Sequence, residues 1–93
     1  MQGKILPIAE SHVGHAYNVQ RELMSQGIRV EVDDRSEKVG LKIREADMQK
    51  IPYMMVIGDK EIKNNSIAVR RRKKGNRREM NVDQLLEEFR GQL

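Results

Sequence analysis

The chain has 93 residues, of which 38% are hydrophobic and 34% are charged, with one Phe, two Tyr, no Trp and no Cys. This length supports a single domain, 1–93, around one core of aliphatic residues and Met, and the lack of cysteine excludes a disulfide framework and a thiolate metal site. No apolar run is long enough to cross a bilayer, and the run at 5–9 leads directly into polar residues, unlike a signal peptide. We therefore expect a cytoplasmic protein.

Positive charge is concentrated in one segment of the chain. Seven of the nine residues from 70 to 78 are Lys or Arg, so the remaining residues are 11 basic and 14 acidic and carry a net negative charge. A basic patch with a defined location is typical of a protein that binds nucleic acid or phosphate. The alternative interpretation is a solvated loop that only aids solubility.

The first elements predicted are a short buried strand at 5–9 and a helix over 12–26. Pro7 has no N–H group and should lie near a strand end or a bulge. Ser11 is a candidate N-cap of the helix, and Gly27 is placed to end it in a left-handed conformation.

A second strand and helix follow. Residues 28–33 alternate strictly between apolar and polar side chains, which is typical of a strand at or near a sheet edge. Ser36 is the candidate N-cap of a helix over 37–49. The apolar stripe expected to face the core consists of Val39, Ile43 and Ala46. Lys42 lies outside that stripe.

The second half of the chain begins with an uninterrupted apolar run at 53–57, which predicts a central strand buried on both faces. Residues 59–63 and 66–70 predict a hairpin whose turn is Asn64-Asn65. Asn81 and Gln84 then form a weak capping-box pattern at the start of a last helix. The order of elements predicts helices packed on a mostly parallel sheet with one antiparallel strand.

Catalytic chemistry has little support in the sequence. There is no cysteine nucleophile, no local Ser, His and acid arrangement, and no Gly-rich phosphate loop after the first strand. Asp33, Asp34 and Asp59 at strand ends are compatible with a metal site of the receiver type. His12 and His15 lack a convincing third metal ligand, so surface histidines are the simpler interpretation.

Recognition of nucleic acid has more support. Ligands of open α/β sheets collect beyond the carboxyl ends of the parallel strands, where this chain has Asp33-Asp34-Arg35-Ser36 and Gly58-Asp59-Lys60-Glu61. Single-stranded RNA exposes base edges, which are read by donors and acceptors placed beside cations. The candidate RNA-binding residues are Arg35, Ser36, Lys38, Glu61, Arg70 and Arg72. The candidate phosphate contacts are Lys42, Lys73, Lys74, Arg77 and Arg78. An ordinary surface ion pair is the alternative for Lys38 and Glu61.

The same residues carry a family resemblance. The matching stretches are Gly27-Ile28-Arg29-Val30 with Asp33 and Arg35, Lys42-Ile43-Arg44-Glu45-Ala46, Lys50-Ile51-Pro52-Tyr53-Met54, Gly58-Asp59-Lys60-Glu61 and Val69-Arg70. They cover nearly the whole chain. Together they resemble the C-terminal anticodon-binding domain of class II aminoacyl-tRNA synthetases, and among these the domain of threonyl-tRNA synthetase.

The resemblance implies a three-layer α/β/α fold. Its five-stranded mixed sheet would have the order 2-1-3-4-5 with strand 4 antiparallel, accompanied by three helices. It also implies binding to the anticodon loop of threonine tRNA. Glu61 and Arg70 match positions that contact anticodon bases in the family, whereas Lys38 and the Arg35-Ser36 turn match the lining of the same pocket. Two positions depart from the family pattern, because Ser36 replaces a common Asn and residues 75–79 replace a Gly-x-Asp-Leu-Gly stretch.

The resemblance implies no cofactor for this domain, because the ATP and zinc sites of the family lie in a separate catalytic domain. The chain alone should then not aminoacylate tRNA. We expect the isolated domain to be a monomer and its parent enzyme a homodimer, with no membrane partner. The rival interpretations are a free-standing, sequence-blind RNA or phosphate binder that uses the basic loop 70–78, and an interaction module with no nucleic-acid role.

Overall fold

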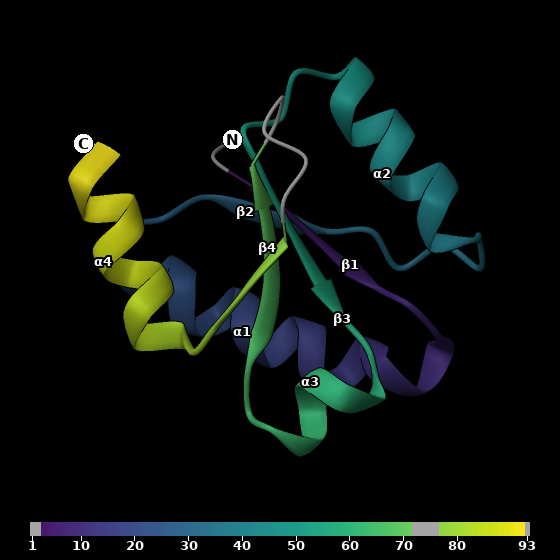
Figure 1. Ribbon diagram of the computed structural model, residues 1–93, viewed down its shortest axis with the longest axis horizontal. Helices are drawn as coiled ribbons and strands as arrows, with labels where there is room; N and C mark the ends of the chain where they lie inside the picture. Colours follow the sequence, from purple (N-terminus) through teal and green to yellow (C-terminus); the bar gives the residue numbers. More distant parts are fainter. Residues whose placement is uncertain (1–2, 72–76, 93) are drawn as a thin grey trace.

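The computed structural model describes residues 3–71 and 77–92, except for the side chains of residues 77 and 90–92. In chain order the elements are β1 (Gly3–Pro7), a 3-10 helix (Glu10–His12), α1 (Val13–Ser25), β2 (Val30–Val32), α2 (Val39–Met48), β3 (Tyr53–Ile57), α3 (Asp59–Lys63), β4 (Ile67–Arg71), β5 (Arg77–Met80) and α4 (Val82–Gln92) (Figure 1).

The five strands form one mixed sheet in the order β2-β1-β3-β4-β5. β1 pairs in parallel with β2 and β3, whereas β4 runs antiparallel to both β3 and β5. The strand order and the antiparallel fourth strand implied by the family resemblance are therefore confirmed. β2 lies at a sheet edge, as its alternating pattern predicts.

Helices cover both faces of the sheet, with α2 on one side and α1 and α4 on the other (Figure 1). The core on the α2 side consists of Leu6, Ile43, Ala46, Ile51, Met54 and Val56. The larger core on the opposite side includes Leu23 of α1 and Phe89 of α4. Neighbouring residues of β1 and β3 belong to different cores because successive side chains of a strand point to opposite faces. The predicted three-layer architecture is confirmed, but the predicted number of three helices is wrong, because the described residues also form the short helix α3.

Both predicted N-caps of the first two helices are wrong. Ser11 lies inside the 3-10 helix, and α2 follows Lys38 rather than Ser36. In place of a serine cap, His12 Nδ1 accepts a hydrogen bond from the backbone N–H of Ala9 at 3.0 Å. β1 also begins and ends two residues earlier than predicted, and Pro7 is its last residue, where no ladder donor is needed.

The segment 59–63 forms helix α3 and not the first strand of a hairpin. Its four charged residues and single Ile62 carry too little periodicity to distinguish a strand from a helix. The side chain of Glu61 decides the outcome, because its Oε1 accepts a hydrogen bond from the backbone N–H of Gly58 at 2.8 Å and so caps the helix start. β4 consequently pairs directly with β3, and the fifth strand comes from residues 77–80.

Three helices end with the same motif before the strand that follows them. After α1, the N–H of Gly27 bonds to Met24 O at 3.0 Å and the N–H of Ile28 bonds to Leu23 O at 3.1 Å, which is the Schellman pattern. The same pair of bonds follows α2 and α3. The residues with positive φ in these motifs are Gly27 (82°), Lys50 (61°) and Asn65 (51°). The predicted role of Gly27 is confirmed.

The last helix begins as predicted. Asn81 Oδ1 accepts a hydrogen bond from the backbone N–H of Gln84 at 2.8 Å, and Gln84 Oε1 accepts one from the backbone N–H of Asn81 at 3.0 Å. These reciprocal bonds are the capping box. They direct the apolar face of α4, with the buried Leu85 and Phe89, onto the sheet.

Replacing Lys50 by Gly is expected to stabilise the fold, because an L side chain is strained at the positive φ of this residue. Relief of ~1–2 kcal/mol of strain is partly offset by the greater freedom of Gly in the unfolded chain, which leaves a net gain of about 0.5–1 kcal/mol. Thermal unfolding followed by circular dichroism should show a Tm a few degrees higher. Gln49→Gly is the matched control and should lower the Tm, because φ at residue 49 is −81°. A lower Tm for Lys50→Gly would contradict this explanation.

Candidate nucleic-acid interface

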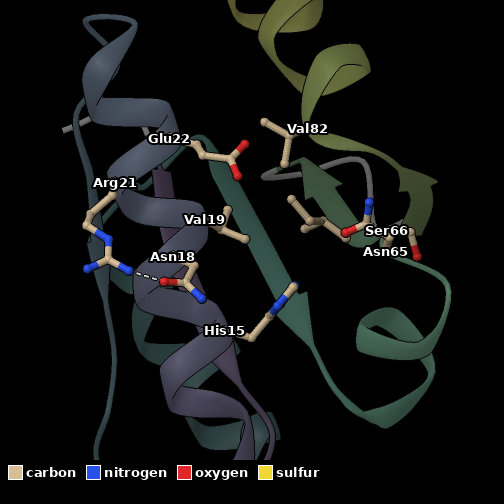
Figure 2. Close-up of a pocket in the computed structure, with 9 residues that line it drawn as sticks. His15, Asn18, Val19, Arg21, Glu22, Asn65, Ser66 and Val82 are labelled. Atoms are coloured by element: carbon tan, nitrogen blue, oxygen red, sulfur yellow. Dashed lines mark hydrogen bonds between the residues drawn. The ribbon is translucent and has the colours of Figure 1, made fainter.

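One open pocket of about 350 Å³ lies between α1 and the starts of β4 and α4 (Figure 2). It is lined by His15, Asn18, Val19, Arg21, Glu22, Asn65, Ser66, Ile67 and Val82. Arg21 donates a hydrogen bond to Asn18 Oδ1 along the surface of α1. The lining includes none of the residues that the sequence predicts to bind RNA.

A second open pocket, of about 330 Å³, is formed around the loop that joins β2 to α2. Its lining consists of Ile8, Ala9, Glu10, Val13, Asp34, Arg35, Ser36, Glu37, Lys38 and Lys42. The residues that follow the carboxyl ends of β1 and β2 therefore meet here, as expected for parallel strands. Four predicted site residues, Arg35, Ser36, Lys38 and Lys42, come together in this pocket.

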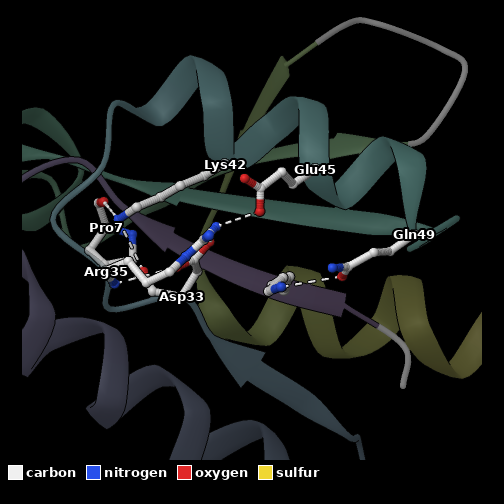
Figure 3. Close-up of polar contacts among 7 residues, drawn as sticks. Pro7, Asp33, Arg35, Lys42, Glu45 and Gln49 are labelled. Atoms are coloured by element: carbon white, nitrogen blue, oxygen red, sulfur yellow. Dashed lines mark hydrogen bonds and ion pairs between the residues drawn. The ribbon is translucent and has the colours of Figure 1, made fainter.

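Arg35 holds the buried carboxylate of Asp33 with a two-pronged contact (Figure 3). Nε donates to Asp33 Oδ1 at 2.8 Å, and Nη2 donates to Asp33 Oδ2 at 2.7 Å and to Glu45 Oε2 at 2.8 Å. The Asp33 side chain is only 2% exposed. The hydrogen bond from Arg35 holds the pKa of Asp33 below its usual range, and the charge of Lys42 adds to this effect. In return, the bonds to Asp33 and Glu45 raise the pKa of Arg35.

Lys42 is buried, which contradicts its expected place outside the inner stripe of α2. The residue is 3% exposed, and its Nζ donates hydrogen bonds to the carbonyl oxygens of Pro7 and Asp33, each at 3.0 Å (Figure 3). These carbonyls lie at the ends of β1 and β2, so the lysine ties α2 to both strands. A contact of Lys42 with RNA phosphate stays a prediction, and its burial argues against it.

Ser36 and Lys38 are exposed in the same pocket. In the part of the chain that the structure describes, neither side chain forms a hydrogen bond, and Lys38 forms no ion pair with Glu61. The Ser36 hydroxyl and the Lys38 ammonium are therefore available to a ligand. This arrangement does not support the alternative of an ordinary surface ion pair at Lys38.

Glu61 lies just beyond the end of β3 and is 9% exposed. Its bond to the N–H of Gly58 fixes Oε1 against the backbone. A Cβ at residue 58 would lie 2.7 Å from Ile8 Cδ1 and 3.2 Å from Glu61 Oε1, so a larger residue would displace the carboxylate. Ile8 also lines the pocket around the β2–α2 loop, so Gly58 lies between a residue of that pocket and Glu61, which is not itself part of the lining.

Arg70 lies farther along the sheet. Its partner in the β3–β4 ladder is Met54, whose side chain belongs to the core on the α2 side. Directly opposed residues of paired strands share a face, so Arg70 lies on the α2 side of the sheet. Arg70 is half-buried. The structure thus places Arg70 and the pocket on the same side of the sheet but at different strand ends.

The other residues of the basic segment do not form one patch. Arg71 forms an ion pair with Glu88 of α4, and its guanidinium lies 5.7 Å from the centre of the Tyr53 ring. Arg78 is exposed and opposes Val69, which belongs to the core on the α1 and α4 side. Arg72, Lys73, Lys74 and the side chain of Arg77 lie outside the described residues. Their contacts with RNA, and those of Arg78, stay predictions.

The aspartates at the strand ends are each engaged by a different partner. Asp34 accepts a hydrogen bond from the hydroxyl of Tyr17 at 2.6 Å, and Asp59 Oδ1 lies 2.7 Å from His12 Nε2. Because His12 Nδ1 accepts from Ala9, Nε2 is the nitrogen that carries the proton and donates to Asp59. His12 is 4% exposed, so the expected surface position is wrong for it. Among the described residues no group of three His, Cys, Asp or Glu side chains is arranged to hold a metal ion.

The fold and the pocket are those of an α/β binding domain, and residues 2–92 match the family described as anticodon binding domain. The chain therefore belongs to the family of anticodon-binding domains. Within that family it is similar to the corresponding part of threonine–tRNA ligases, which is the resemblance inferred from the sequence. That part is non-catalytic.

Two relatives illustrate the match. The threonine–tRNA ligase of Geobacillus kaustophilus is 51% identical over 87 residues, and that of Clostridioides difficile is 47% identical over 85 residues. These alignments cover 92% and 91% of this chain but only 13% of either ligase. The chain thus spans a small part of the length of these relatives.

A solved structure agrees with the sequence match. The RNA binding domain of threonyl-tRNA synthetase from Cryptosporidium parvum Iowa II superposes with a TM-score of 0.93 at 32% identity. The superposition covers 97% of this chain and 23% of that one. No helix within the described residues is long and apolar enough to cross a membrane.

The pair formed by Asp33 and Arg35 predicts a specific dependence of stability on pH. The pKa of Asp33 is lowered in the folded protein, so this carboxylate stabilises the fold above its ordinary pKa and loses that contribution as the pH falls through the lowered value. Asp33→Asn should cost about 2 kcal/mol at neutral pH. It should also make the loss of stability in acid less steep than in the unsubstituted protein.

Urea unfolding at a series of pH values between neutral and strongly acidic would measure both effects. Asp47→Asn is the control, because it removes a carboxylate from α2 that has no described ion pair. If Asp33→Asn and the unsubstituted protein lost stability in parallel as the pH fell, the Asp33 carboxylate would not be the responsible group.

Proposed function

We propose that this chain is the domain by which a threonyl-tRNA synthetase binds the anticodon loop of threonine tRNA, and so supports the selection of tRNA in translation. The observation that carries the proposal is the pocket at the carboxyl ends of β1 and β2, which Ser36 and Lys38 line with exposed side chains, while Glu61 follows the end of the neighbouring strand β3. Such a mixture of donor, cation and acceptor suits the exposed edges of unpaired RNA bases.

The proposal gives different roles to the residues of the pocket, to Glu61 and to Arg70, which lies on the same side of the sheet but at the other strand end. Ser36 and Lys38 contact the loop from the β2–α2 connection, and Glu61 and Arg70 contact anticodon bases. Glu61 suits a base donor because Gly58 already fixes one of its carboxylate oxygens, so the acceptor is held in place before RNA binds. Arg70 suits a base acceptor on the α2 side of the sheet. Phosphate contacts come from Lys73, Lys74, Arg77 and Arg78, and Arg72 contributes to RNA binding.

The wider setting is part of the same proposal. The domain acts in the cytoplasm as a part of a longer ligase, it is monomeric by itself, and its parent enzyme is a homodimer. It uses no cofactor, since ATP and zinc act in the catalytic domain of such ligases. Aminoacylation is therefore a property of the parent enzyme and not of these 93 residues.

The direct test is a titration of the protein into a labelled anticodon stem-loop of threonine tRNA, at two salt concentrations. A second stem-loop has its second and third anticodon bases changed. We expect tighter binding of the first stem-loop, and a preference that survives the higher salt because it depends on base contacts. Equal binding that disappears with salt would instead favour a sequence-blind binder that uses the basic segment 70–78.

Single substitutions test the two base contacts. Arg70→Ala and Glu61→Ala should each weaken binding of the matching stem-loop by ~1–3 kcal/mol and reduce the preference for it. Arg21→Ala is the control for the arginine, because Arg21 is exposed on α1, on the other face of the sheet. It should lower the affinity for both stem-loops to the same small extent. Equal losses for both stem-loops in the Arg70 or Glu61 variant would refute base recognition at that residue.

A further inference from the structure

The loop from residue 33 to residue 38 presents Ser36 and Lys38 to the pocket, yet its own backbone gives it little rigidity. Backbone hydrogen bonds hold its two ends, from Asp33 N–H to Ile5 O at 2.9 Å and from the N–H groups of Leu41 and Lys42 to Lys38 O at 3.0 and 3.2 Å. Between these ends the backbone hydrogen bond runs from Glu37 N–H to Arg35 O at 2.9 Å. No side chain caps the start of α2. The placement of residues 34–37 must therefore depend on side-chain contacts, of which one is the hydrogen bond from the Tyr17 hydroxyl to Asp34 Oδ2 at 2.6 Å.

Arg35 supplies the other contacts from the middle of the loop. Its guanidinium is held by Asp33 at one end of the loop and by Glu45 in the second half of α2, while its backbone N–H approaches Asp33 Oδ1 at 3.3 Å. Three hydrogen bonds restrict the position of the planar Arg35 guanidinium. They therefore also restrict the backbone on either side of Arg35. Ser36 follows Arg35 directly.

The groups that hold Arg35 are themselves fixed. Asp33 is buried, its N–H bonds to Ile5 O of β1, and its carbonyl oxygen accepts a hydrogen bond from Lys42. Lys42 and Glu45 lie one helical turn apart on α2, so the helix that anchors the guanidinium is also the helix tied to the strand ends. The contacts form a closed frame of β1, β2, α2 and the loop (Figure 3).

We propose that Arg35 is a positioning residue: held by Asp33 and Glu45, it fixes the loop so that Ser36 and Lys38 contact the RNA and Arg35 itself does not. This inference rests on the proposed function and reassigns a residue that the sequence analysis predicts to be an RNA contact. Lys42 is a positioning residue of the same frame, with its Nζ on the carbonyl oxygens of Pro7 and Asp33.

The proposal makes a prediction opposite in sign to simple electrostatics. RNA is a polyanion, so neutralising a carboxylate near its binding surface should strengthen binding of any RNA. If Glu45 works by holding Arg35, its neutralisation should instead weaken binding of the matching stem-loop. Glu37 provides a matched comparison, because it lies in the same loop, is exposed, and its carboxylate contacts no described cation.

The first part of the experiment uses the free protein and no RNA. Backbone amide chemical shifts and hydrogen exchange of residues 34–38 are measured in Glu45→Gln, Arg35→Lys and Glu37→Gln, with the Tm of each variant as a check on folding. We expect faster exchange and altered shifts at Ser36 and Lys38 in the first two variants only. Amides at 34–38 that remain unchanged in both Glu45→Gln and Arg35→Lys would overturn the proposal.

The second part repeats the stem-loop titration with the same variants. Glu45→Gln should weaken binding of the matching stem-loop by roughly fivefold, as expected when a charge-assisted hydrogen bond becomes a neutral one. Arg35→Lys keeps the positive charge but loses the bidentate contact of the guanidinium with Asp33. It should reduce the preference for the matching stem-loop over the changed one. Glu37→Gln should bind both slightly more tightly. Uniformly tighter binding by Glu45→Gln would overturn the positioning role.

The two parts of the experiment test the positioning role of Arg35 and the proposed function independently. If the unsubstituted protein fails to prefer the matching stem-loop, recognition of the anticodon is refuted, and the amide measurements still decide whether Arg35 fixes the loop. If the preference is present and Glu45→Gln leaves it and the amides unchanged, the proposed function stands and the positioning role is refuted.

Discussion

The contact between Lys42 and two strand-end carbonyls is the interaction on which the site depends. Burying an ammonium group is costly unless hydrogen bonds replace the water it loses. Lys42 meets this requirement with the oxygens of Pro7 and Asp33, at the ends of the two neighbouring parallel strands β1 and β2. A residue that would destabilise the core if left unpaired thus becomes the link that sets α2 over the strand ends. The loop that carries Ser36 and Lys38 joins β2 to α2, the two elements that Lys42 connects.

Negative groups have a related structural role at the same end of the molecule. Asp33, Asp34 and Asp59 each follow a strand, and each is bound by a different neutral or positive side chain, Arg35, Tyr17 or His12. Engaged in this way, they connect the loops after β1, β2 and β3 to the helices around them. Within the described residues they act as structural anchors and are not grouped so as to hold a metal ion.

The fold could be predicted from the sequence where a local residue pattern is compatible with a single backbone structure. The apolar run 53–57, Gly27 at a helix end and the Asn81–Gln84 capping box all had their predicted structure. The errors arose where tertiary contacts decide. Glu61 gives the segment 59–63 a helical start that its weak periodicity does not reveal, although Gly58 followed by a Glu three residues later was a signal of it. Similarly, no pattern within α2 shows that Lys42 finds two carbonyl acceptors from other elements.

The basic segment shows that a high density of charge along the sequence does not by itself predict a charged surface in the folded protein. Successive residues of a strand point to opposite faces, so Arg70 and Arg71 lie on different sides of the sheet. Arg71 is engaged by Glu88 and Tyr53, and Arg78 lies on the side of α1 and α4, opposite to Arg70. Only Arg70 among these three shares a face with α2. The sheet therefore divides these three arginines between its two sides, and the basic segment does not present them as one surface.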